Sequence, residues 1–106
     1  MSRINQLLIN AMDNTTTLTL IDGRFHPDDA REILMNVFAS KLTFHRLKNL
    51  SSNERYGIED EIAQKRIPEL TMQMEKLQQL LMEAKAINAT LQISSAIHIS
   101  FSSDRP

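Results

Sequence analysis

The sequence lacks cysteine and tryptophan altogether and has few residues that interrupt regular structure. Without cysteine the chain can form no disulfide, no thiolate zinc site and no cysteine nucleophile, which is typical of proteins from a reducing compartment. Two glycines and three prolines in 106 residues favour long helices and strands over many turns. The two glycines, Gly23 and Gly57, stand far apart, so the sequence contains no glycine-rich phosphate loop.

The chain also lacks a surplus of charge and a long apolar run. Its formal net charge is −1, from 12 basic and 13 acidic residues, so no global field attracts nucleic acid or an anionic membrane. No apolar stretch approaches the ~20 residues of a membrane-spanning helix, and the N-terminus has no secretory-signal pattern. We therefore expect a cytoplasmic protein without a membrane partner, with residues 1–106 as one domain.

The strongest pattern in the chain is an apolar repeat at steps of four and three residues. This spacing puts the side chains along one seam of a single helix, which we expect from about Ile58 to Asn88. Such a seam needs a partner, either another helix of this chain or a second copy. Pro68 falls inside it, and the unbroken phase favours one kinked helix over two helices. The seam residues are Ala63, Ile67, Leu70, Met74, Leu77, Leu81 and Ala84.

A first long helix is expected from Pro27 to about Asn49. Proline suits the first helical position, and the acidic Asp28 and Asp29 suit the positive end of the helix dipole. An interhelix loop is expected over residues 51–57, with a possible one-turn helix at its start, and this makes the two helices antiparallel neighbours. The expected buried face of the first helix comprises Ala30, Ile33, Leu34, Val37, Phe38, Phe44 and Leu47.

Two segments flanking the helices predict strands. Residues 15–21 are rich in β-branched side chains, and Asp22-Gly23 predicts a turn after them. From Thr90 the apolar period becomes two, which predicts a strand with one apolar face. We expect a short amphipathic helix over residues 2–12, within an N-terminal arm of residues 1–13, and a disordered tail over residues 102–106.

Together these elements predict an α+β fold of order β-α-α-β. A long antiparallel helical hairpin is packed on a small antiparallel sheet, preceded by the short N-terminal helix. A two-stranded sheet is marginal in water and leaves the C-terminal strand with an open edge, so we expect that edge to pair with a second copy. The alternative is a monomer whose N-terminal segment covers the edge. The candidate homodimer interface is Leu91, Ile93, Ile97, Ile99 and Phe101.

Signals for catalysis are weak. The three histidines, His26, His45 and His98, lie far apart, and none has a carboxylate at metal-ligand spacing. We therefore predict a non-enzymatic protein with no catalytic, cofactor-binding or metal-binding residues.

Basic residues gather toward the end of the first helix, where Lys41, His45 and Lys48 are spaced at i, i+4 and i+7. We predict a small dimeric interaction or scaffold protein that binds itself or an unidentified protein. The alternative is a weak nucleic-acid or acidic-partner binder, although nearby acidic residues cancel much of the field. The candidate partner-binding residues are Lys41, His45, Arg46, Lys48, Asn49 and Arg55.

Overall fold

The computed structural model describes residues 14–102. They form strand β1 (Thr15–Phe25), helix α2 (Pro27–Tyr56), helix α3 (Glu61–Ala86) and strand β2 (Leu91–Ser100), which confirms the α+β class and the order β-α-α-β. The predicted helix over residues 2–12 and the tail beyond Ser102 lie outside the described residues. The described residues divide into a strand unit, residues 14–23 and 92–102, and a helical unit, residues 24–91.

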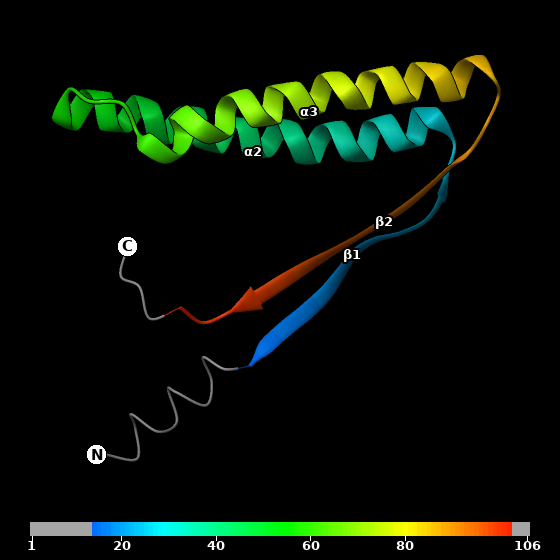
Figure 1. Ribbon diagram of the computed structural model, residues 1–106, viewed down its shortest axis with the longest axis horizontal. Helices are drawn as coiled ribbons and strands as arrows, with labels where there is room; N and C mark the ends of the chain where they lie inside the picture. Colours follow the sequence, from blue (N-terminus) through cyan, green and yellow to red (C-terminus); the bar gives the residue numbers. More distant parts are fainter. Residues whose placement is uncertain (1–13, 103–106) are drawn as a thin grey trace. The chain divides into compact units, whose positions relative to one another are not determined.

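Helices α2 and α3 lie side by side and antiparallel, as a helical hairpin (Figure 1). Two polar contacts set their register. At one end Lys85 Nζ lies 3.3 Å from Asp28 Oδ1, and near the turn the Asp60 N–H donates to Asn49 Oδ1 at 2.8 Å. In an antiparallel pair with these two contacts, His45 of α2 lies level with residues 63–67 of α3.

The seam predicted for α3 is confirmed. Its four most enclosed members are Ala63, Leu70, Leu81 and Ala84, and the other three are half-buried. Since α2 lies against this helix, the partner that the seam requires is a helix of the same chain. Pro68 is inside α3, which continues through it as the unbroken phase predicts.

The ends of α3 differ from the predicted ones because of two capping arrangements. The Asp60 side chain accepts a hydrogen bond from the Ala63 N–H at 2.9 Å, so the helix begins at Glu61 and not at Ile58. At the other end Asn88 adopts a left-handed conformation, with φ at 54°. The Ala89 N–H then donates to the Ala84 carbonyl at 2.8 Å, a Schellman arrangement that ends the helix at Ala86.

Helix α2 is longer than predicted. It continues through Ser51, Ser52 and Asn53 to Tyr56, so the predicted interhelix loop over residues 51–57 is wrong for all but its last residue. Serine and asparagine each cost at most ~0.7 kcal/mol in a helix relative to alanine, and here all three are half-buried. Gly57 supplies the stop: its φ is 67°, and its N–H donates to the Asn53 carbonyl at 2.9 Å.

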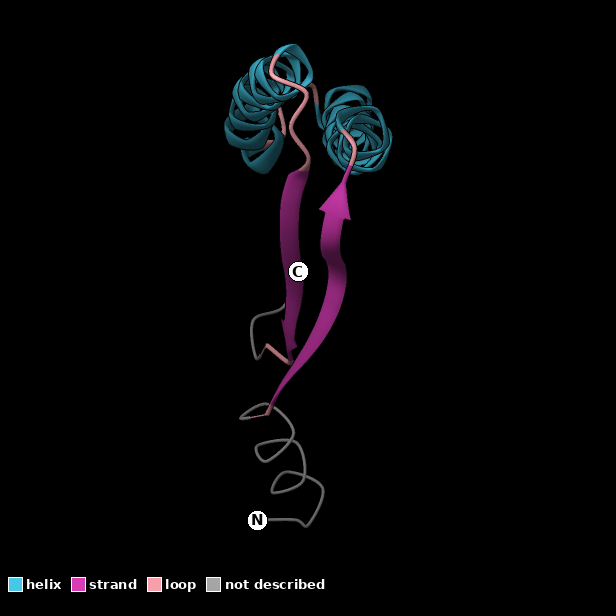
Figure 2. Cartoon of the chain, turned by 90° about the vertical axis from the view of Figure 1, so that its right-hand side faces the viewer, coloured by secondary structure: helices cyan, strands magenta, loops and turns pink. Residues whose placement is uncertain are grey.

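Strands β1 and β2 form a two-stranded antiparallel ribbon (Figure 2). Strand β1 runs through Asp22 and Gly23 to Phe25, so the predicted turn at Asp22-Gly23 is wrong. The reason is that β2 is ten residues long and supplies backbone partners beyond the point where the turn would begin. An aspartate-glycine pair marks a turn only where the chain must reverse, and here it does not.

The two faces of the ribbon follow from one contact. Thr17 Oγ1 lies 3.1 Å from His98 Nδ1, so these side chains share a face, and alternation along each strand assigns the rest. The polar face carries Thr15, Thr17 and Thr19 together with the even-numbered residues of β2, and the same alternation places Ile21, which is 8% exposed, on this face. The apolar face, defined here by its larger side chains, consists of Leu18, Leu20, Leu91, Ile93, Ile97, Ile99 and Phe101.

The packing of the helical hairpin on the sheet and the grouping of residues 1–106 into one domain stay predictions.

Candidate interaction surfaces

The apolar face of the ribbon is open to solvent over much of its area. The side chains of Leu18 and Leu20 are 50% and 48% exposed, and those of Ile97, Ile99 and Phe101 are 40%, 51% and 68% exposed. Single exposed apolar residues are normal on a protein surface, but contiguous apolar patches mark interaction sites. This face is contiguous, because its members alternate along two paired strands.

The ribbon also has open edges. Within the described residues its sheet has only two strands, so one side of each strand has no strand partner. Natural sheets protect such edges with lysine, proline or short strands. Strand β2 is ten residues long and contains no proline and no lysine. It therefore offers a full row of backbone donors and acceptors to a further strand.

The structure brings the five candidate dimer residues together on this apolar face. Leu91 and Ile93 are half-buried, and the other three are exposed. A shallow groove lies at the end of the ribbon where β1 begins and β2 ends. It is lined by Asn14, Thr16, Ile99, Ser100 and Phe101. Leu18 and Leu20, which were not among the predicted interface residues, extend the face onto β1. Their alternation within a threonine-rich segment was the signal that could have identified them.

The six candidate partner-binding residues all belong to α2, but they do not lie on one surface of this helix. His45 is 4% exposed, and its Nε2 has no hydrogen-bond partner within the described part of the chain. Asn49 is half-buried, and its side chain ties α2 to Asp60 at the hairpin turn. His45 is therefore enclosed and Asn49 is engaged at the hairpin turn, so neither joins the exposed cations of α2.

The face of α2 that is buried differs from the predicted one, which explains why these residues are separated. The predicted buried face included Val37, Phe44 and Leu47, but these side chains are 44%, 49% and 60% exposed. Leu42 and His45 are buried in their place. The actual contact line runs through Ala30, Leu34, Phe38, Leu42, His45 and Asn49 at steps of four and three. Because histidine was counted as a polar residue, the predicted buried face is rotated about the helix axis away from this contact line.

Three of the cations do lie on one exposed surface. It is a stripe of α2 at steps of four and three, called here the flank stripe. The Nζ atoms of Lys41 and Lys48 lie 5.0 Å and 5.9 Å from the centroid of the Phe44 ring between them. Arg46 lies two residues from Lys48, about 200° around the helix, and so falls on the opposite flank. The flank stripe consists of Val37, Lys41, Phe44, Lys48, Ser51 and Arg55.

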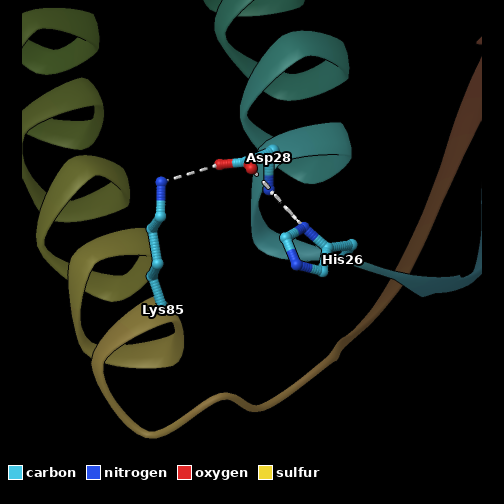
Figure 3. A network of polar contacts seen from close by, with 3 residues as sticks. All are labelled: His26, Asp28 and Lys85. Atoms are coloured by element: carbon cyan, nitrogen blue, oxygen red, sulfur yellow. Dashed lines mark hydrogen bonds and ion pairs between the residues drawn. The ribbon is translucent and has the colours of Figure 1, made fainter.

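At the end of the hairpin where α2 begins and α3 ends, His26, Asp28 and Lys85 form a polar network (Figure 3). The His26 Nδ1 accepts a hydrogen bond from the Asp28 N–H at 3.2 Å, which makes His26 the N-cap of α2. The Asp28 carboxylate contacts the Lys85 ammonium at 3.3 Å. All three side chains are more than half exposed. The network caps and pins helix ends, and its exposure gives no enclosed site for chemistry.

Within residues 14–102, no group of three or more histidine, aspartate or glutamate side chains is placed to hold a metal ion. Neither of the two described helices has an apolar stretch long enough to cross a bilayer.

The arrangement thus offers two surfaces for binding: the apolar face and open edge of the ribbon, and the flank stripe of α2. Compared with protein-family models, with curated proteins and with solved structures, the chain matches none.

Proposed function

We propose that this protein is a non-enzymatic assembly module that pairs with a second copy of itself through the β2 edge. The single observation that supports this proposal is the apolar face of the ribbon, whose exposed side chains adjoin an unprotected strand edge. Paired antiparallel about a two-fold axis, two β2 strands join two ribbons into one four-stranded sheet. Such a sheet reaches the size at which a sheet becomes independently stable.

The charge pattern favours a second copy as the partner. A two-fold axis brings identical segments together, so any charge on the edge would face its own copy and oppose pairing. Residues 91–101 contain no lysine, arginine, aspartate or glutamate. The only titratable side chain there is that of His98, which lies on the polar face beside Thr17. Self-pairing of β2 therefore meets no fixed like-charge repulsion.

The magnitudes also favour the ribbon as the assembly surface. Full burial of a leucine, isoleucine or phenylalanine side chain stabilises by ~1.5–3 kcal/mol. An exposed ion pair such as Lys85–Asp28 contributes ~0–1 kcal/mol. Several half-exposed apolar side chains on one face of the ribbon thus offer more binding free energy than an exposed ion pair does. If the helical hairpin packs on the sheet as predicted, it would cover the joined apolar face.

Sedimentation of the full chain tests the proposal. We expect the wild-type protein to sediment with twice the mass of one chain. The double variant Ile97→Lys with Ile99→Lys places two charges on the apolar face and should sediment as one chain or unfold. The matched control, Ser94→Lys with Ala96→Lys, adds the same charge to the polar face of the same strand and should leave the dimer intact.

A wild-type protein that sediments as one chain at micromolar concentration would contradict self-pairing and favour an N-terminal segment over the edge. Equal dissociation of both double variants would show that added charge, and not the apolar face, controls the assembly. A cytoplasmic location belongs to the same proposal, and the absence of cysteine supports it.

A further inference from the structure

The flank stripe of α2 combines exposed apolar side chains with cations in a regular order. Val37 and Phe44 are 44% and 49% exposed, and Lys41 and Lys48 lie beside the Phe44 ring. Arg55 continues the same line two turns farther along the helix. The stripe is not used by the helical hairpin, which is held together on the adjacent face of α2.

Between Val37 and Ser51 the charge along the stripe has one sign, and Glu54, the first acidic residue beyond it, lies next to Arg55. From Ile33 to Asn53 the helix contains three basic residues and no aspartate or glutamate. Three acidic groups near the hairpin turn have partners in the structure, whereas the side chains of Glu54 and Glu61 have none within the described residues. Glu69 is ion-paired with Arg66 on the same helix, Glu59 accepts a hydrogen bond from Gln64, and the Asp60 side chain caps α3. Within residues 14–102, Lys41, Lys48 and Arg55 form no ion pair, so they can attract an acidic partner.

We propose that the flank stripe docks an acidic amphipathic helix of a partner protein. Seven residues of helix separate Lys41 from Lys48, and seven separate Lys48 from Arg55, which is about 10 Å in each case. A partner helix with one acidic residue per heptad has the same spacing. Its apolar side chains would lie on Phe44 and Val37, and its carboxylates would reach the three cations.

The other occupants fit the stripe less well. Duplex nucleic acid carries one negative charge per ~1.7 Å of its axis, whereas the stripe offers three cations over about 21 Å. Exposed Val37 has no role against a phosphate backbone. A second copy placed stripe against stripe would bring lysine against lysine or arginine, which is repulsive. An acidic helix satisfies both the charge and the apolar side chains.

Fluorescence anisotropy with the full chain tests this assignment. The probe is a labelled 21-residue helical peptide of three heptads, with a leucine stripe flanked by glutamates. We expect saturable binding that weakens at least tenfold in the double variant Lys41→Glu with Lys48→Glu. The matched control Arg46→Glu, on the opposite flank of the same helix, should bind within twofold of the wild type.

A second pair of variants tests the apolar part of the surface. Phe44→Ala should weaken peptide binding several-fold, whereas Leu50→Ala should not. Leu50 is 55% exposed and lies about 120° around the helix from Phe44. Circular dichroism of each variant checks that the helices persist, so that a loss of binding reports on the surface itself.

Three results would overturn the proposal. The first is absence of peptide binding, or equal loss in Arg46→Glu. The second is binding of a labelled 20-base-pair DNA duplex in preference to the peptide, with steep loss between 50 and 200 mM salt. The third is a change of sedimentation mass in the Lys41→Glu, Lys48→Glu variant, which would identify the occupant as a second copy. Retained mass with lost peptide binding supports the proposal and separates this surface from the β2 edge.

Discussion

The Thr17 hydroxyl oxygen lies 3.1 Å from the Nδ1 of His98, across the two strands of the ribbon. This contact joins residues 81 positions apart and fixes which side chains share a face. Because of it, Leu18 and Leu20 of β1 share a face with Ile97 and Ile99 of β2, while Asp22 and Arg24 continue the β1 side of that face. The proposed self-pairing depends on that assignment.

The register can be tested by cross-linking. The chain has no native cysteine, so a variant with Thr17→Cys and His98→Cys can form only one disulfide within a chain. Cross-strand neighbours on one face have the Cβ separation that a disulfide needs, and we expect it to form on mild oxidation. The control pair, Thr17→Cys with Ile97→Cys, places the thiols on opposite faces. Mass spectrometry of oxidised monomeric chains should show the bond only in the first variant, and the reverse result would refute the face assignment.

His45 should limit the stability of the helical hairpin. Its side chain is buried and its Nε2 has no hydrogen-bond partner among the described residues. A buried polar atom without a partner costs ~1–3 kcal/mol, so His45→Leu should raise the free energy of unfolding by about that amount. Urea denaturation at fixed protein concentration measures the change. His45→Asn retains a polar group there and should give no gain; a less stable leucine variant would contradict the burial of His45.

The α3 seam predicts a sharp contrast between adjacent leucines. Leu81 is 4% exposed in the seam, and Leu80 is 56% exposed on the outer side of the same helix. Leu81→Ala should lower the free energy of unfolding by ~2–5 kcal/mol, because it leaves a cavity against α2. Leu80→Ala should change it by less than ~0.5 kcal/mol. Similar losses in the two variants would place Leu80 in an interface as well.

Pro68 should reduce the stability of α3 without ending the helix. It is exposed, and the helix is continuous on both sides of it. Proline lacks the N–H that would bond to the Gln64 carbonyl and costs ~3 kcal/mol relative to alanine in a helix interior. Pro68→Ala should therefore stabilise the chain by up to ~3 kcal/mol in thermal or urea unfolding. A loss of stability would show that the hairpin requires the proline.

The elements with strong periodicity could be predicted from the sequence. The seam of α3 and the alternation in β2 each depend on one repeated spacing, and both agree with the structure. The antiparallel hairpin followed from the closeness of the two helices in the chain. Local composition alone predicted less well: Ser51, Ser52 and Asn53 are helical, and Gly23 lies within a strand, because packing and strand pairing outweigh weak local preferences.

The candidate surfaces could be predicted only in part. The apolar alternation of β2 indicated the ribbon face, but its pairing with Leu18 and Leu20 depends on a register that spacing alone does not give. In α2 the basic residues were recognised as a group, yet the helix phase separates them. His45 occupies a position in the contact line where a leucine would be expected, so the phase could not be read from apolar residues alone.

We propose above that the outer edge of β2 pairs with a second copy. Amide hydrogen exchange, measured for each residue by NMR, is the most direct test of this pairing. In a lone two-stranded ribbon, alternate β2 amides point away from β1 and exchange rapidly with solvent. Self-pairing predicts that both alternating sets of β2 amides exchange slowly in the wild-type protein. It also predicts that Ile97→Lys with Ile99→Lys frees the outward set. Rapid exchange of every second β2 amide in the wild type, at concentrations where the chain is intact, would contradict it.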